Sequence, residues 1–146
     1  MRSLQRILLA EDDQRDIDLT LAALKEINLD SKVDVVRDGE EALDYLFKRS
    51  KYRNRESNDP VVLLLDIKMP KVDGLDVLKQ IKESDELRHI PVVMLTSSKI
   101  DSDMMASYKL GVNAYIVKPV EFEDFLKAVK KLGSFWAILN EPPPEI

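Results

Sequence analysis

The sequence predicts an α/β sandwich in which helices cover both faces of a five-stranded parallel sheet. Five short aliphatic runs lie along the chain, at positions 7–10, 33–36, 61–65, 92–95 and 115–117. Buried parallel strands have this nearly continuous apolar character because helices shield both of their faces. Helical patterns follow each run. Strands and helices therefore alternate, as in doubly wound folds.

Each helical pattern begins just after a residue that suits the start of a helix, and its apolar side chains recur three or four positions apart. The expected helices follow Asp13, Asp38, Asp73, Asp101 and Pro119. With right-handed crossovers, five such β-α units give a (βα)5 sandwich of the flavodoxin type, with strand order 2-1-3-4-5.

Length and composition fit one small domain. The chain has 146 residues, a formal net charge of -5 and no cysteine. Because nucleic-acid binding needs a basic surface and disulfides need cysteine, neither is expected. A basic stretch at 49–55 is diluted by Glu56 and Asp59, and we expect a solvated loop there. No apolar run approaches the ~20 residues of a membrane span, and no signal peptide is evident. We expect a soluble cytoplasmic protein without membrane contact.

Polar side chains follow four of the apolar runs at the point where each run ends. Glu11 and Asp12 follow the first run, Asp66 the third, Thr96 the fourth and Lys118 the fifth. Taken singly, these residues have structural explanations as helix caps, turn formers or surface groups. In a parallel sheet, however, all of them meet at the carboxyl edge, where open α/β folds bind ligands. This coincidence favours one functional site.

The residue types at this edge suggest phosphoryl chemistry. Three converging carboxylates repel one another, so the cluster binds protons or a cation. Oxygen ligands in an incomplete cage favour Mg²⁺, which shares phosphate oxygens readily. Asp66 is a candidate carboxylate nucleophile toward phosphorus. Lys118 and the Thr96 hydroxyl are placed to neutralise and hydrogen-bond a transferring phosphoryl group.

These residues resemble the motifs of the receiver domain of bacterial and archaeal two-component response regulators. The resemblance covers roughly residues 5–132. The matching stretches are the acidic pair at 11–12, the segment 65–70 with Asp73 and Gly74 behind it, 95–97, and 114–119.

The resemblance implies a phosphoacceptor and a metal site. By this likeness Asp66 is the phosphoacceptor, Asp12 and Asp66 are direct Mg²⁺ ligands, Glu11 is a ligand through water, and Lys68 offers its backbone carbonyl. Mn²⁺ is expected to substitute for Mg²⁺. For Asp13 we prefer helix capping to metal binding.

The resemblance also implies a switch. Thr96 would be the switch hydroxyl and Tyr115 the switch aromatic, although Tyr115 also suits an ordinary strand position. Lys118 would bridge to the phosphoryl group, with a cis peptide bond between Lys118 and Pro119. The signalling surface would then comprise the fourth helix, the fifth strand and the fifth helix.

The phosphoryl donor is expected to be a partner histidine kinase that docks largely on the first helix. The one histidine of the chain, His89, is expected in an exposed loop at the edge of the sheet opposite Asp66. The chain would catalyse only its own aspartyl phosphorylation and dephosphorylation, and is otherwise not an enzyme. Its output would be a protein effector or a phosphotransfer protein, and no DNA-binding output domain is expected.

Two further features resemble the small single-domain regulators associated with cyanobacterial phytochromes and related sensor kinases, so the partner kinase is expected to be phytochrome-like. These features are a lengthened loop at 51–59 and an aromatic, then proline-rich, tail. We expect a receiver domain at 1–133 and an extension at 134–146. Phe135 and Trp136 either extend the core or form a homodimer contact.

Other classes of protein remain as alternatives. A flavin or nucleotide carrier has this fold, but the first strand lacks a glycine-rich phosphate loop. A metal-dependent phosphatase shares the chemistry but usually needs a cap or substrate pocket. A docking module that keeps the site without using it, and a phosphate sink in a phosphorelay, both stay open.

Overall fold

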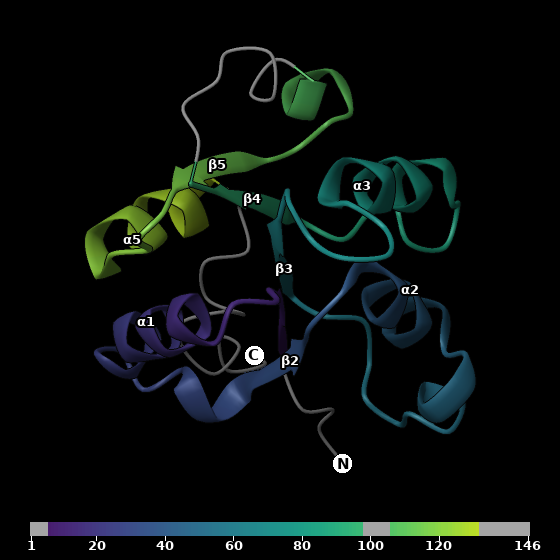
Figure 1. Ribbon diagram of the computed structural model, residues 1–146, viewed down its shortest axis with the longest axis horizontal. Helices are drawn as coiled ribbons and strands as arrows, with labels where there is room; N and C mark the ends of the chain where they lie inside the picture. The colour runs from purple at the N-terminus through teal and green to yellow at the C-terminus, as the bar shows by residue number, and fades with distance from the viewer. Residues whose placement is uncertain (1–5, 98–105, 132–146) are drawn as a thin grey trace, which may run out of the picture.

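The predicted strands form one parallel sheet. The structure is a computed structural model that describes residues 6–97 and 106–131. Its strands run in the order β2-β1-β3-β4-β5, and all neighbouring pairs are parallel. Their bounds are β1 Ile7–Ala10, β2 Val33–Val36, β3 Val62–Asp66, β4 Val92–Thr96 and β5 Ala114–Val117. The expected fold class and strand order are confirmed (Figure 1).

Three helices begin directly after the predicted aspartates Asp13, Asp38 and Asp73, whereas the helix start predicted after Asp101 lies outside the described residues. The helices are α1 Gln14–Lys25, α2 Gly39–Phe47, α3 Gly74–Glu83 and α5 Phe122–Lys131, and residues 106–109 are also helical. Aspartate side chains cap α1, α2 and α3 by accepting a hydrogen bond from a backbone N–H in the first turn, which satisfies one of the otherwise unpaired donors there. No helix within these described ranges is long and apolar enough to cross a membrane.

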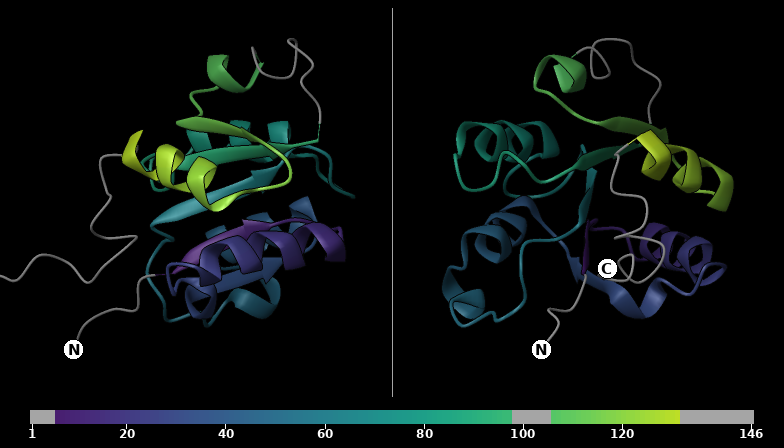
Figure 2. Two further views of the ribbon diagram at one scale, coloured as in Figure 1. Left: turned by 90° about the vertical axis from the view of Figure 1, so that its left-hand side faces the viewer. Right: turned by 180° about the vertical axis from the view of Figure 1, so that it is seen from behind.

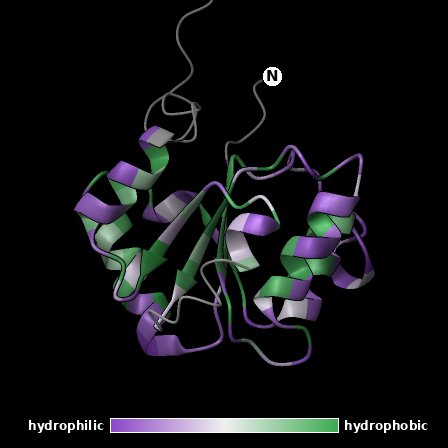
Figure 3. Cartoon of the chain, turned by 90° about the horizontal axis from the view of Figure 1, so that it is seen from above, coloured by the Kyte–Doolittle hydropathy of each residue, from purple (hydrophilic) through white to green (hydrophobic). Residues whose placement is uncertain are grey.

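Two hydrophobic cores lie on opposite faces of the sheet. The helices α1 and α5 cover one face, while α2 and α3 cover the other (Figures 1 and 2). Strand residues alternate between the two cores, so that Leu9 packs toward α1 and α5 whereas Leu8 packs toward α2 and α3, as the pleat of a strand requires. The strands are correspondingly apolar and the outer helix faces polar (Figure 3).

The connection between α2 and β3 is largely exposed, as expected of a solvated loop, but it also makes specific contacts with α2. It includes a short 3-10 helix, Ser50–Tyr52. The Arg55 guanidinium lies 4.3 Å from the centre of the Tyr45 ring, and its Nε donates a hydrogen bond to the Tyr45 carbonyl oxygen at 3.0 Å. Lys51 Nζ lies 2.7 Å from Glu41 Oε2, although the lysine itself is exposed. The basic residues therefore fix the loop to α2, because that helix supplies an aromatic ring and a carboxylate for them.

Two glycines allow α2 and α3 to approach the segment that follows β3. A Cβ atom on Gly74 would lie 2.1 Å from the Asp66 carbonyl oxygen, and one on Gly39 would lie 1.8 Å from that of Val72. The Gly74 N–H donates a hydrogen bond to the Ile67 carbonyl oxygen at 2.6 Å. Only glycine permits such close backbone contact.

We predict that Gly74→Ala destabilises the protein by about 1–3 kcal/mol, the usual range for overpacking. Helix propensity alone would favour alanine by about 1 kcal/mol, so the sign of the change distinguishes the two effects. Urea denaturation measures it. Lys79→Ala, at an exposed position of α3, is the control and should change stability by less than about 0.5 kcal/mol. A stabilised Gly74→Ala protein would contradict the close-contact explanation.

Candidate functional site

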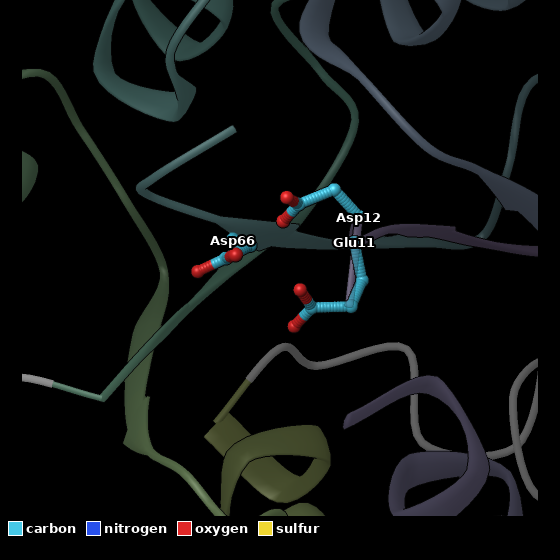
Figure 4. Close-up of side chains that lie close together, drawn as sticks. All are labelled: Glu11, Asp12 and Asp66. Carbon is cyan, nitrogen blue, oxygen red and sulfur yellow. The ribbon is translucent and has the colours of Figure 1, made fainter. Parts of the chain in front are cut away.

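The three predicted carboxylates meet at the carboxyl edge of the sheet. Glu11 and Asp12 follow β1, and Asp66 is the last residue of β3. One oxygen from each of the three side chains lies within 4.8 Å of the other two. In Figure 4 the three carboxyl groups gather in the same space between the ends of these strands. The arrangement is that of an oxygen cage for a cation.

Strand alternation explains which of the edge residues share a face of the sheet. Each of three residues, Glu11, Asp66 and Lys118, comes two positions after a residue packed toward α1 and α5. Those preceding residues are Leu9, Leu64 and Ile116. Because side chains two apart in a strand lie on the same face, these carboxylates and the lysine come together on the α1 side.

Lys118 occupies the centre of this cluster. Its Nζ donates hydrogen bonds of 2.8 Å to Glu11 Oε1 and to Asp16 Oδ2, and it lies 3.5 Å from Asp66 Oδ2. Only 9% of the lysine side chain is exposed. Burial alone would lower the pKa of Lys118, but the hydrogen bonds to Asp16 and Glu11 outweigh it and raise the pKa above its ordinary value. The lysine is therefore protonated and positively charged at neutral pH.

Asp16 belongs to this cluster, although the sequence does not predict a place for it there. An acidic residue in the first turn of a helix is already explained by the helix dipole. The available signal is helical spacing, since Asp16 precedes the buried Thr20 by four residues and so lies on the inward face of α1.

Asp66 is an unusually weak acid in this setting. Burial, and after it the negative charge of Glu11, raise the pKa of Asp66 to about 7 against the opposing positive charge of Lys118. Only 4% of the residue is exposed. A buried carboxylate beside another carboxylate favours the proton, and a bound cation would replace that proton.

Thr96 and Tyr115 lie on neighbouring strands. Thr96 is the buried last residue of β4, and its carbonyl oxygen accepts a hydrogen bond from the Lys118 backbone N–H at 2.6 Å. Tyr115 pairs in register with Met94, two residues before Thr96, and its side chain packs with the core of α2 and α3. The rings of Tyr115 and Tyr108 are stacked, with centres 6.5 Å apart. Strand alternation thus places Thr96 and Tyr115 on one face.

Most of the remaining predicted residues can be located in the structure. The peptide bond between Lys118 and Pro119 is cis, and Lys68 is exposed two residues beyond Asp66. His89 precedes β4 with 63% of its side chain exposed and Nε2 3.5 Å from Asp59 Oδ2. Phe135 and Trp136 lie outside the described residues.

Comparison with known proteins identifies the family. The chain matches the response regulator receiver domain over residues 7–130, which is nearly its whole length. It belongs to the receiver-domain family. The resemblance expected from the motifs is thereby confirmed.

Among the similar receiver proteins are bacteriophytochrome response regulators. The bacteriophytochrome response regulator RtBRR is 60% identical, with a TM-score of 0.85, over 97% of this chain and 85% of that chain. The corresponding AtBRR is 59% identical, with a TM-score of 0.86, over 96% of this chain and 100% of that chain. Receiver domains of such regulators work with histidine kinases.

Response regulator Rcp1 of Synechocystis sp. is 41% identical over 130 residues, covering 89% of this chain and 87% of Rcp1. A crystal structure of Rcp1 in its Mn²⁺-bound form has 38% identity and a TM-score of 0.75 to this chain, and covers 97% of this chain and 99% of that one. The carboxylates of Glu11, Asp12 and Asp66 fit a divalent cation, because they are hard oxygen donors with excess negative charge.

We predict a pH-dependent effect of Asp66→Asn in metal-free protein. The folded-state pKa of Asp66 is about 7, above the ~3.9 of an unfolded aspartate. Protonated Asp66 therefore stabilises the folded wild-type protein. This stabilisation is complete below the pKa of the unfolded state and is lost as pH rises through the pKa of the folded state. From about pH 5 to about pH 7, the variant should therefore gain stability relative to wild type by up to about 1 kcal/mol per pH unit.

Urea denaturation in the presence of EDTA measures this difference at each pH. Asp85→Asn is the control, because 90% of the Asp85 side chain is exposed. A stability difference between Asp66→Asn and wild type that stays constant with pH would show that Asp66 is not a weak acid in the folded protein.

Proposed function

We propose that this chain is a response regulator that accepts a phosphoryl group on Asp66 from a partner histidine kinase in a Mg²⁺-dependent reaction. The observation that carries the proposal is the position of the Asp66 carboxylate, which belongs to the oxygen cage and lies 3.5 Å from the Lys118 ammonium. This is the arrangement that in-line phosphoryl transfer to a carboxylate needs.

In the transfer step an ionised Asp66 oxygen attacks the phosphorus of a phosphohistidine. The new O–P bond forms as the N–P bond breaks, and the departing electron pair stays on the imidazole nitrogen, which then takes a proton from water. Asp12 and Asp66 would hold Mg²⁺ directly, Glu11 through water and Lys68 through its carbonyl oxygen, and the bound ion would neutralise charge on the transferring group. Lys118 supplies a second positive charge.

Thr96 and Tyr115 form the proposed switch. A phosphoryl group shifts a conformational equilibrium only if it contacts one state better than the other. The Thr96 hydroxyl would make that contact, and Tyr115, on the same face of the sheet, would move into the space that Thr96 leaves. The surface of the helix around 106–109, β5 and α5 would then change for a protein partner.

The proposed setting is a two-component phosphorelay in the cytoplasm, with no nucleic-acid target. The donor would be a phytochrome-like sensor kinase, and the output a protein effector or a phosphotransfer protein. The chain would catalyse only its own phosphorylation and dephosphorylation. We propose the domain limits 1–133 and 134–146, with Phe135 and Trp136 either extending the core or forming a homodimer contact.

We predict that incubation with Mg²⁺ and acetyl phosphate adds one phosphoryl group to the wild-type protein, as measured by intact mass. Neither the Asp66→Ala variant nor protein in EDTA should show the adduct, because the nucleophile or the cation is then missing. Asp85→Ala removes an exposed aspartate and should label normally. An adduct that survives in Asp66→Ala would place the phosphoryl group elsewhere.

We also predict that Thr96→Ala takes up phosphate but loses its effect on β5. In wild type, phosphorylation should change amide hydrogen exchange at 114–117 through the switch. Each ~1.4 kcal/mol of lost differential contact reduces the population ratio about tenfold, so the change should disappear in the variant. Ser97→Ala removes the neighbouring exposed hydroxyl and should respond as wild type. An undiminished exchange response in phosphorylated Thr96→Ala would contradict this switch.

A further inference from the structure

The Lys118 ammonium has a defined orientation in the site. An ammonium group carries three N–H donors. Glu11 and Asp16 each accept one at 2.8 Å, and the nearest further carboxylate oxygen is Asp66 Oδ2 at 3.5 Å. With two donors held in short charge-assisted hydrogen bonds, the third is available toward Asp66. The two anchors therefore determine where the remaining donor points.

The two anchors have different surroundings. Glu11 is also one of the clustered carboxylates, so a bound cation would compete with Lys118 for the same side chain. Its other oxygen accepts a hydrogen bond from the Asp13 N–H at 3.2 Å. Asp16 is not among the clustered carboxylates of the described residues. Its carboxylate therefore serves Lys118 whether or not the cage is filled.

Asp16 is itself held in place. Its backbone N–H donates a hydrogen bond to Asp13 Oδ1 at 2.9 Å, which caps α1. The Asp16 side chain is 28% exposed, whereas the Lys118 side chain is 9% exposed. The capped first turn of α1 thus presents a fixed carboxylate to a nearly buried ammonium, so the contact is screened less than one on the open surface.

We propose that Asp16 is a positioning residue that keeps the third N–H of Lys118 directed at Asp66 and at the phosphoryl group formed there. This role rests on the proposed function of the site. Asp16 touches neither the phosphoryl group nor the cation, and it acts through Lys118.

The test compares Asp16→Asn with Asp18→Asn, using Mg²⁺ and acetyl phosphate. Both substitutions remove one negative charge from α1, but exposed Asp18 contacts Gln14 on its own helix. The initial rate of phosphate uptake by intact mass should fall about tenfold or more in Asp16→Asn, the scale of one charge-assisted hydrogen bond. It should stay within about twofold of wild type in Asp18→Asn. Asp16→Glu keeps the carboxylate and should recover part of the rate.

A spectroscopic measurement separates positioning from a general loss of structure. The side-chain ammonium of Lys118 should give a slowly exchanging ¹⁵N signal in wild type, because its protons are held in short hydrogen bonds. The signal is assigned by its absence in Lys118→Arg. It should persist in Asp18→Asn and disappear in Asp16→Asn, while the backbone amide spectrum of both variants stays that of a folded protein.

Equal rates in Asp16→Asn and Asp18→Asn, or a faster rate in Asp16→Asn, would overturn the role of Asp16 while wild type still labels. A Lys118 signal that persists in Asp16→Asn would overturn it as well. Failure of the wild-type protein itself to take up phosphate would contradict the proposed function instead.

Discussion

The imbalance of charge at the carboxyl edge of the sheet is the constraint on which the rest of this molecule depends. One buried ammonium, that of Lys118, faces the carboxylates of Glu11, Asp16 and Asp66, while Asp12 lies beside the same cluster. A single positive charge cannot neutralise them all. The excess negative charge raises the pKa of Asp66, favours binding of a divalent cation, and holds the lysine in place. The flanking structure keeps these like charges together despite their repulsion: the strands bring the side chains to one edge, and the Asp13 cap sets the start of α1 against it.

The sheet separates the acidic cluster from the tyrosine of the proposed switch. Glu11, Asp66 and Lys118 lie on the side of α1, whereas Tyr115 packs with the core of α2 and α3. Thr96 lies on the same face as Tyr115 and is linked to the lysine through the backbone, because the Lys118 N–H donates to the Thr96 carbonyl oxygen. In the proposed switch, a phosphoryl group that attracts the lysine on one face and the threonine hydroxyl on the other would pull on adjacent, paired strands. Such communication across the sheet would not need a long path through the protein.

Most of the fold and much of the site follow from the sequence for physical reasons. The strand from Val33 to Val36 is found where the aliphatic run predicts it, and the aspartate caps begin α1, α2 and α3 as expected. The carboxylates converge because parallel strands share a direction. Two features escape this reasoning. Helical spacing places Asp16 on the inward face of α1, but its contact with Lys118 also depends on how α1 lies against the sheet, which spacing alone does not determine. The loop that carries Arg55 has the composition of a solvated segment, but the Tyr45 ring provides it with a partner.

The loop that Arg55 fixes to α2 leads into the start of β3, so it lies at the amino edge of the sheet, opposite the carboxylates. Extra length there leaves the distances among the site residues unchanged, whereas the segment from Asp66 to Gly74 has no such freedom because two glycines seat helices directly on its backbone. Insertions are therefore tolerated better at the amino edge of the sheet than at its carboxyl edge. A fluorophore or affinity handle attached at exposed Arg53 would therefore sit on an anchored loop remote from the acidic cluster, and would report tumbling of the molecule without contacting the cluster.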